Sequence, residues 1–186
     1  MPKVLIPLAP GCEELEAITV IDLLRRAEIE VLTAGLNEGP VTASRGVVIL
    51  PDTTLDHILE NQAGDEFDMI VLPGGLPGAD HLMNDQRLQQ LLKRQIDAGK
   101  RVAAICAAPK ALARAGLLKG RQATAYPGTL EALNLENTRI SAEAVIIDDK
   151  VITSRGPGTA MDFALTLIEQ LLGREKRDVV EAGLVR

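Results

Sequence analysis

A chain of 186 residues with 46% apolar residues is long enough for one domain with a sizeable core. Aromatic residues make up only 2% of the sequence, so this core must consist mainly of Val, Ile, Leu and Ala. The net charge of −6 and the lack of basic patches with interleaved aromatic residues argue against nucleic acid as a direct partner.

The N-terminal segment and the number of cysteines indicate in which cellular compartment the protein is located. Residues 1–11 carry one Lys and a short apolar run, which is too short for the core of a signal peptide. No segment approaches the roughly 18 consecutive apolar residues of a membrane span, so we expect no membrane association. Two cysteines in a long chain do not indicate a disulfide framework. The sequence therefore predicts a cytoplasmic protein with reduced thiols.

Apolar strands and helical segments alternate through the first half of the chain. The sequence predicts a strand at Lys3–Leu8, a helix at Glu13–Ala27, a strand at Ile29–Ala34, short strands at Val41–Thr42 and Val47–Leu50, a short helix at Leu55–Asn61 and a strand at Asp68–Leu72. The first helix is acidic in its first turn and ends on Arg25 and Arg26, which complements the helix dipole. Its apolar residues cover more than one stripe, which indicates a contact between subunits.

The same alternation continues to the end of the chain. We predict a helix at Asp85–Ala98, a strand at Arg101–Ile105, a helix after Cys106 through Ala115, a hairpin of Val145–Ile147 and Val151–Thr153, a helix at Thr159–Leu172 and a shorter charged helix after Gly173. No internal repeat or linker divides the sequence, so residues 1–186 form a single domain. Such alternation favours an α/β fold with a mostly parallel sheet and helices on both faces. Ligands of such sheets bind beyond the carboxyl ends of the strands.

Cys106 lies where a predicted strand runs directly into a helix, in the segment VAAICAAP. A nucleophile on such an elbow needs small neighbours, and Ala residues surround this one on both sides. The partial positive charge at the start of the following helix favours a thiolate. The alternative is an inert core cysteine, because a free Cys is often buried.

Gly74 and Gly75 end another predicted strand, in the segment LPGG. Glycines at that edge allow backbone N–H groups to approach a ligand, and with the N–H of Ala107 they could form an oxyanion hole. The alternative is a simple turn. The order of the glycines does not fit a dinucleotide-binding motif, so we expect no nicotinamide cofactor and no other resident cofactor.

Glu16 lies among apolar neighbours in the segment GCEELEA. A carboxyl group buried there would have a raised pKa and could hydrogen-bond a thiolate. The three acidic residues could instead only complement the helix dipole. Cys12, in the same segment, could face Cys106 as a resolving thiol or be a plain loop cysteine.

The remaining candidates are positively charged or imidazole side chains. Arg45 and Arg155 could attract an anionic substrate or an oxidised cysteine, although surface arginines are the simpler interpretation. His57 is expected on a peripheral helix and His81 at the surface, so neither supports a Cys–His dyad. No pair of His or Cys has the spacing of metal ligands, and we predict no metal site.

Taken together, the segments LAPGCEELEA, SRGVVI, IVLPGG, AAICAAP and TSRGPGTAMDFAL resemble the ThiJ/PfpI superfamily. The similarity extends from the first strand to at least Gly173. It is strongest to the branch of the parkinsonism-associated protein and the bacterial YajL-like proteins. The resemblance implies a flavodoxin-like three-layer α/β/α sandwich, similar to class I glutamine amidotransferases, and a homodimer.

The resemblance also implies roles for individual residues. Cys106 would be the nucleophile, and Glu16 the protonated carboxyl group beside its sulfur. Gly75 and Ala107 would supply backbone donors, Gly74 would line the pocket, and the pocket-bordering arginines would be Arg45 and Arg155.

One position departs from the pattern of the family. Some relatives place a His near the pocket where this chain has Tyr126, whose side chain, with an ordinary pKa of about 10, is not a base near neutral pH. Cysteine peptidase chemistry is therefore the weakest of the implied functions.

Two functions remain. The first is a glutathione-independent glyoxalase or protein deglycase that acts on small dicarbonyls or glycated proteins, with Glu16 as proton shuttle. The second is a redox-responsive chaperone or stress sensor that acts through a Cys106 sulfinate.

Overall fold

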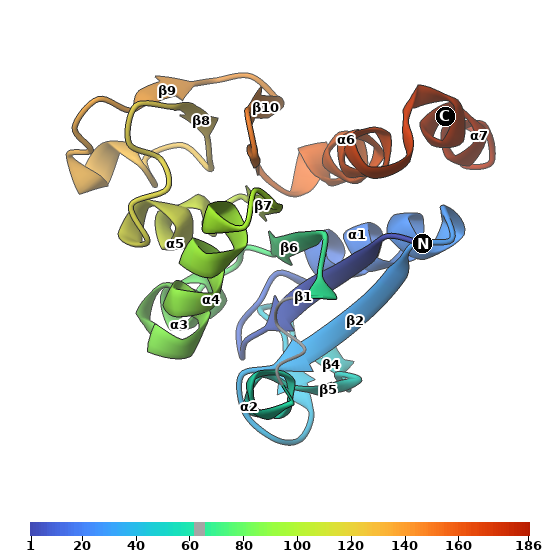
Figure 1. The fold of residues 1–186 in the computed structure, drawn as a ribbon, viewed down its shortest axis with the longest axis horizontal. Coiled ribbons are helices and arrows are strands. Elements are labelled where there is room, and N and C mark those ends of the chain that lie inside the picture. Colours follow the sequence, from blue (N-terminus) through green and yellow to red (C-terminus); the bar gives the residue numbers. More distant parts are fainter. Residues whose placement is uncertain (62–65) are drawn as a thin grey trace.

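The computed structural model describes residues 1–61 and 66–186, which form one seven-stranded sheet with helices on both faces (Figure 1). The strands of this sheet are β1 (Lys3–Leu8), β2 (Glu30–Gly35), β5 (Thr53–Thr54), β6 (Met69–Leu72), β7 (Arg101–Ile105), β10 (Val145–Asp148) and β11 (Val151–Ser154). They are arranged in the order β10-β11-β7-β6-β1-β2-β5. Of the neighbouring pairs in this sheet, β10 and β11 are antiparallel and the others are parallel.

Two small sheets of short strands lie outside the main one. β3 (Val41–Thr42) pairs antiparallel with β4 (Val48–Ile49), where two short strands are predicted, and β8 (Gln122–Thr124) runs parallel to β9 (Arg139–Ser141). The sequence did not predict β5, β8 or β9. Strands of two or three residues are too short to show an alternation of apolar and polar residues.

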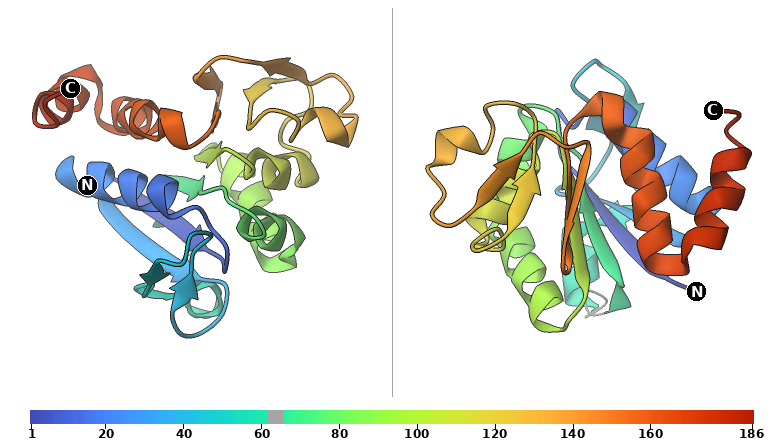
Figure 2. Two further views of the ribbon diagram at one scale, coloured as in Figure 1. Left: turned by 180° about the vertical axis from the view of Figure 1, so that it is seen from behind. Right: turned by 90° about the horizontal axis from the view of Figure 1, so that it is seen from above.

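The helices cover the sheet in two layers (Figure 2). One layer contains α1 (Glu14–Arg26), α6 (Ala160–Leu172) and α7 (Arg174–Ala182), and the other contains α2 (Leu55–Glu60), α3 (Gly78–Asn84), α4 (Gln86–Asp97) and α5 (Pro109–Arg114). Two 3-10 turns, η2 (Glu131–Leu133) and η3 (Pro157–Thr159), complete the described elements. The sequence did not predict α3, because its glycine and proline neighbours resemble a loop.

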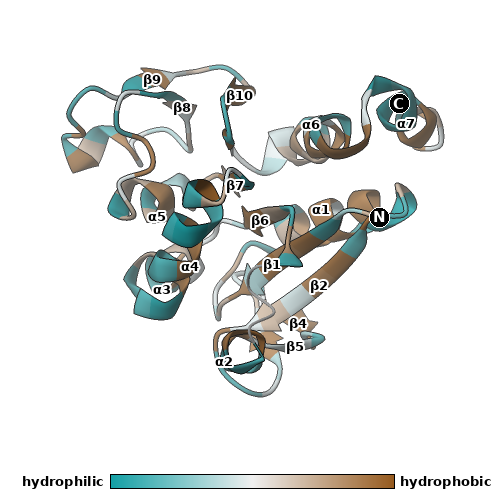
Figure 3. Cartoon of the chain, in the orientation of Figure 1, coloured by the Kyte–Doolittle hydropathy of each residue, from teal (hydrophilic) through white to brown (hydrophobic). Residues whose placement is uncertain are grey.

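The core follows from the alternation of side chains along each buried strand. Leu5 packs with the layer of α3, α4 and α5, whereas its neighbours Val4 and Ile6 pack with the layer of α1 and α6. The hydropathy colouring shows the apolar residues of β1, β2 and β6 at the centre of the molecule (Figure 3). The three-layer α/β/α fold predicted from the sequence is confirmed, with the ends of most elements shifted by one or two residues.

The described residues contain no helix of the length and apolar character that crossing a membrane requires. Thr159 directly precedes α6, but its hydroxyl group makes no hydrogen bond that caps this helix. Thr159 Oγ1 instead contacts Ser154 Oγ at 2.7 Å and the backbone of Gly156, so it stabilises the turn between β11 and α6.

Candidate active site

Cys106 directly follows β7 and adopts a strained backbone conformation. Its φ of 63° lies in the left-handed region, which residues other than glycine rarely occupy. The backbone is fixed on both sides, because the N–H of Cys106 donates to Ser154 O at 3.0 Å and its carbonyl accepts from Tyr126 N at 2.8 Å. α5 begins at Pro109, so the sulfur lies on a tight strand-to-helix turn of the kind that presents nucleophiles.

Glu16 is a fully buried carboxyl group on the first turn of α1. Glu13 caps this helix by accepting the N–H of Glu16 at 2.8 Å, which fixes the backbone there. Glu16 Oε2 accepts the N–H of Gly74 at 2.8 Å. Among the described residues, Oε1 has no conventional hydrogen-bond partner, although the side chain of Cys106 interacts with this carboxyl group.

Gly74 lies between these two side chains. A Cβ atom on this residue would lie 2.6 Å from the Cβ of Cys106 and 2.8 Å from Glu16 Oε2. Both distances are shorter than real Cβ contacts allow, so only a glycine permits the carboxyl group and the cysteine to approach each other here. Gly74 therefore has two roles: its N–H donates a hydrogen bond to Glu16, and its missing side chain leaves the space that Glu16 and Cys106 need.

Gly75 and Ala107 direct backbone N–H groups toward the sulfur. Both groups hydrogen-bond Cys106 and thereby lower the pKa of its thiol. Gly75 has a φ of 86°, and a Cβ atom on it would lie 2.4 Å from Glu13 N and 2.6 Å from Gly11 O. The turn that presents this N–H group therefore requires glycine.

The sequence predicts a Cys106 thiolate beside a protonated Glu16 carboxyl group, but the pKa values of the two groups favour a thiol beside a carboxylate above pH 7. Burial, which disfavours the charged form, raises the pKa of Glu16 to about 7. Burial, followed by the charge of Glu16 and its hydrogen bond, raises the pKa of the Cys106 thiol to about 12 against the effect of the two N–H groups. The backbone amides alone thus do not ionise the thiol. Between the two pKa values the pair retains one proton, which lies mainly on the sulfur of Cys106, and the carboxylate of Glu16 carries the negative charge.

Glu14 is a positioning residue that the sequence did not single out. Its buried carboxylate accepts hydrogen bonds from Ser44 Oγ at 3.0 Å and from Arg45 N at 2.9 Å. Burial opposes its ionisation, but the hydrogen bonds from its own backbone, Ser44, Val47 and Arg45 outweigh that effect and lower its pKa. Glu14 therefore fixes the turn between β3 and β4. Within the EELE segment, Glu14, two positions before Glu16, could not be distinguished from a residue that only complements the helix dipole.

The predicted pocket arginines have different surroundings. Arg45 is exposed at the turn fixed by Glu14, and no ion pair or hydrogen bond of its guanidinium is found within the described part of the chain. Arg155 is half-buried, and its Nη1 donates to Ala142 O at 2.8 Å. Arg155 is therefore already engaged with the loop before β10, whereas Arg45 can approach a ligand.

Tyr126 lies next to the elbow, with its backbone N–H on Cys106 O and its ring against Gly156. The side chain is 54% exposed. The histidines are at the surface, as the sequence predicts: His57 lies on α2, and His81 Nδ1 contacts Pro10 O at 3.0 Å.

Cys12 and Cys106 are both free thiols. Cys12 is fully buried, and burial raises its pKa to about 11, so it is poorly suited to act as a resolving thiol. Within residues 1–61 and 66–186, no group of three or more His, Cys, Asp or Glu side chains could hold a metal ion.

The chain is similar to known proteins over nearly its whole length. The chain is 46% identical over 182 residues to "Protein dj-1beta" of Drosophila melanogaster, which covers 97% of this chain and 95% of that protein. It is 38% identical over 173 residues to "Glutathione-independent glyoxalase DJR-1.2" of Caenorhabditis elegans, with 92% and 90% covered. Two Arabidopsis thaliana relatives are longer, and the chain spans 41% and 46% of their lengths.

Solved structures agree with this similarity. The crystal structure of Drosophila melanogaster DJ-1beta superposes with a TM-score of 0.92 at 45% identity, covering 99% of this chain and 97% of that one. "Toxoplasma gondii DJ-1, oxidized" gives a TM-score of 0.90 at 37% identity, with 100% and 98% covered. Residues 2–170 match the DJ-1/PfpI family, which includes the ThiJ/PfpI proteins that the sequence resembles. The chain therefore belongs to the DJ-1/PfpI family.

Proposed function

We propose that this chain is a cysteine-dependent enzyme that converts small reactive dicarbonyls without glutathione, as a glyoxalase and protein deglycase. The observation that carries the proposal is the approach of the buried Glu16 carboxyl group to Cys106 over Gly74. A nucleophile next to a group that can accept and return its proton is the arrangement of covalent catalysis. The C. elegans relative named as a glutathione-independent glyoxalase supports this reaction class.

The first step adds the sulfur of Cys106 to the aldehyde carbon of methylglyoxal. A C–S bond forms, the π electrons of the C=O bond move to oxygen, and the thiol proton passes to Glu16. The N–H groups of Gly75 and Ala107 stabilise the developing oxyanion until it takes that proton, which gives a hemithioacetal.

Glu16 then moves protons within the hemithioacetal. Its carboxylate removes the proton from the former aldehyde carbon, and the electron pair forms an enediolate with the neighbouring ketone. The enediolate oxygen takes up the hydroxyl proton of the former aldehyde carbon. Return of the carbon-bound proton from Glu16 to the other carbon then gives a thioester of lactate on Cys106. Water cleaves this thioester, so the net reaction adds one water to methylglyoxal and releases lactate and the free thiol. A pKa of about 7 allows Glu16 to act as both base and acid near neutral pH.

The same chemistry extends to glycated proteins. An early adduct of methylglyoxal on a Cys, Lys or Arg side chain is a hemithioacetal or hemiaminal at the former aldehyde carbon. Collapse of this adduct breaks the bond to the side chain, which takes up the hydroxyl proton, and regenerates the aldehyde. Cys106 then adds to that aldehyde, and the later steps are unchanged. The exposed Arg45 would attract adducts that carry negative charge.

The test is the formation of lactate from methylglyoxal by purified protein free of glutathione. We expect turnover in the wild type and in Cys12→Ala, and its loss in Cys106→Ala. Glu16→Gln should form the hemithioacetal but not lactate. If Cys106→Ala retains wild-type turnover, the enzyme proposal is wrong.

A redox sensor or chaperone acting through Cys106 is the second candidate function. It is favoured by Oε1 of Glu16, which has no conventional hydrogen-bond partner within the described part of the chain, because a protonated carboxyl group could donate to an oxygen atom on the sulfur. Two molecules of peroxide would oxidise the thiol to a sulfinate and be reduced to water. A relative solved as "Toxoplasma gondii DJ-1, oxidized" supports this chemistry. Mass spectrometry after graded peroxide tests it: oxidation of Cys12 before Cys106, or no effect of Glu16→Gln, contradicts it.

We further propose a homodimer in the cytoplasm. Leu15 and Ile18 on α1 are 51% and 45% exposed, and Met161 on α6 is 46% exposed. Because α1 packs beside α6, these side chains can form an apolar surface for a second copy. Sedimentation of the wild type against Ile18→Lys tests this: we expect a dimer that the substitution weakens, whereas a monomeric wild type contradicts it.

A further inference from the structure

A closed ring of three hydrogen bonds holds Glu16 at the start of α1. Glu13 Oε2 accepts the N–H of Glu16 at 2.8 Å, and Glu16 Oε2 accepts the N–H of Gly74 at 2.8 Å. Gly74 O in turn accepts the N–H of Glu13 at 2.9 Å. Each of the three residues donates one bond and accepts one, so a displacement of any of them moves the other two.

This ring is an interrupted form of the capping box. In a capping box, the N-cap side chain accepts the N–H of the third helical residue, whose own Glu or Gln side chain reaches back to the N-cap N–H. Glu13 is the N-cap of α1 and Glu16 is its third residue, and the first of these bonds is present. The backbone of Gly74 takes the place of the second, because it bonds both the Glu13 N–H and the Glu16 carboxyl group. The Glu16 side chain therefore does not close the box, and it lies next to Cys106 instead.

Glutamate is not among the residues preferred at the N-cap of a helix. Asn, Asp, Ser and Thr are favoured there, and Asp85 and Thr54 cap α4 and α2 in this way. Glu13 has a longer side chain and is half-buried, with its carboxylate on the N–H of Glu16. A departure from a local rule beside the proposed catalytic pair points to a role other than helix stability.

The charge of Glu13 also acts on the proton affinity of Glu16. Burial is the largest cause of the raised pKa of Glu16, and the negative charge of Glu13 adds to it. The hydrogen bonds with Gly74 and Cys106 act in the opposite direction. The ionisable side chains that interact with Glu16 are thus Glu13 on the same helix and Cys106 after β7, together with Cys12 after β1, whose thiol is affected by the charge of Glu16.

We propose that Glu13 is a positioning residue of this site, which directs the Glu16 carboxyl group toward Cys106 through the ring and sets its negative charge beside that group. The inference rests on the proposed function, in which Glu16 takes up and returns protons. The ring determines where the carboxyl group lies, and the charge determines at which pH it loses its proton. Substitutions at position 13 separate these contributions, because they can retain the cap, the charge, both or neither.

Titration of the Glu16 carboxyl carbon by ¹³C NMR, in the full chain labelled at its glutamate side chains, tests the proposal without turnover. Glu16→Gln identifies the signal. Glu13→Gln keeps an oxygen for the N–H of Glu16 but removes the charge, so the Glu16 midpoint should fall by at least about 0.2 pH unit. Glu13→Asp keeps a cap and the charge, and its midpoint should match that of the wild type.

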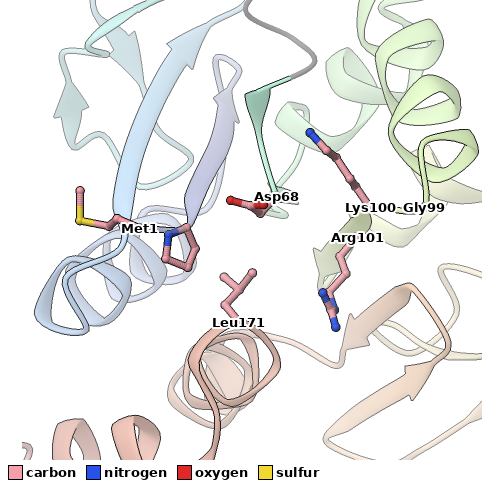
Figure 4. Close-up of a pocket in the computed structure, with 7 residues that line it drawn as sticks. Met1, Asp68, Gly99, Lys100, Arg101 and Leu171 are labelled. Carbon is pink, nitrogen blue, oxygen red and sulfur yellow. The ribbon is translucent and has the colours of Figure 1, made fainter.

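The control for the removed charge is Asp68→Asn. Asp68 lies at the opposite end of β6 from Gly74, beside a cavity at the amino ends of the strands (Figure 4). Asn can still accept the N–H of Lys3 there, so the fold is retained. Thr54→Ala, which removes the cap of α2, is the control for a lost cap. Neither variant should shift the midpoint of Glu16.

Steady-state kinetics with methylglyoxal gives the second measurement. Glu13→Ala removes both cap and charge, so kcat should fall about tenfold or more while KM stays within about twofold, and Glu13→Asp should restore most of kcat. The proposal is wrong if Glu13→Gln leaves the midpoint unchanged, if a control variant shifts it equally, or if Glu13→Ala turns over like the wild type. A wild type that forms no lactate, with the midpoint still shifted in Glu13→Gln, contradicts the proposed function but supports the role of Glu13.

Discussion

Glu16 and Cys106 meet over the bare Cα of Gly74, where a methyl group would lie 2.6 Å from the Cβ of Cys106. Glu16 comes from the start of α1 and Cys106 from the end of β7, so the pair depends on the packing of the helix layer onto the sheet. The backbone N–H of Gly74 also holds Glu16 Oε2 at 2.8 Å. One glycine thus sets both the distance and the orientation of the two groups.

Gly74→Ala should separate the pair. The added methyl group must displace either the cysteine or the carboxyl group, and overpacking of this kind costs about 1–3 kcal/mol. We expect lactate formation to fall at least about tenfold, while urea denaturation still shows one cooperative transition. Gly158→Ala is the control, because nothing lies within 4 Å of a Cβ atom there. Wild-type turnover in Gly74→Ala would show that the close approach is not needed.

Glu16→Gln should change how stability depends on pH. The pKa of Glu16 is raised from 4.5 to about 7 in the folded state, so its contribution is full below pH 4.5 and is lost as the pH rises through 7. Gln does not titrate and keeps an acceptor for Gly74. We therefore expect the variant to gain stability relative to the wild type between pH 5 and pH 8, by on the order of 2 kcal/mol. Urea denaturation at several pH values measures this difference, and a constant difference would contradict the raised pKa.

Glu14→Gln should loosen the turn between β3 and β4. Its carboxylate accepts hydrogen bonds from Ser44 and Arg45, and an amide group would replace one acceptor with a donor. We expect a loss of about 1–3 kcal/mol at pH 7 and a higher KM for anionic substrates, because Arg45 is less well positioned. The pKa of Glu14 is lowered, so its stabilisation is lost at low pH and the gap between variant and wild type closes below pH 4.5. Glu175→Gln, on exposed α7, is the control.

Tyr126→Phe should leave lactate formation within about twofold of the wild type. The backbone of Tyr126, not its hydroxyl group, contacts Cys106, and a phenol is not a base near neutral pH. Steady-state kinetics measures this, and a loss of more than tenfold would assign the hydroxyl group a catalytic role that the present mechanism lacks. Tyr126→His then asks whether an added base changes the pH profile.

Local sequence patterns were sufficient to predict the helix and sheet layers of the fold and the strand-to-helix turn at Cys106. The apolar run of β7, the cysteine and the small residues after it predict a strand-to-helix turn, which the φ of Cys106 shows directly. Glu16 was recognisable because a carboxyl group among apolar neighbours on a buried helix face is unusual. These features are local in sequence, and each has its own physical cause.

Contacts distant in sequence could not be predicted in the same way. The hydrogen bonds of Glu14 join residues about 30 positions apart, and the steric role of Gly74 depends on three separate segments. The proton balance of Cys106 also depends on burial, which sequence patterns describe only coarsely. Short strands such as β8 and β9 are stabilised by their neighbours rather than by their own composition.

The most direct test is the rate at which iodoacetamide alkylates Cys106 as a function of pH, in the wild type and in Glu16→Gln. Because burial and the Glu16 carboxylate raise the pKa of the Cys106 thiol to about 12, the wild-type rate should have its inflection far above the ordinary thiol value. Glu16→Gln removes the charge that raises this pKa, so its inflection should lie at lower pH than in the wild type. One inflection at the ordinary thiol value of about 8.5 in both proteins would contradict the interaction of Glu16 with the sulfur.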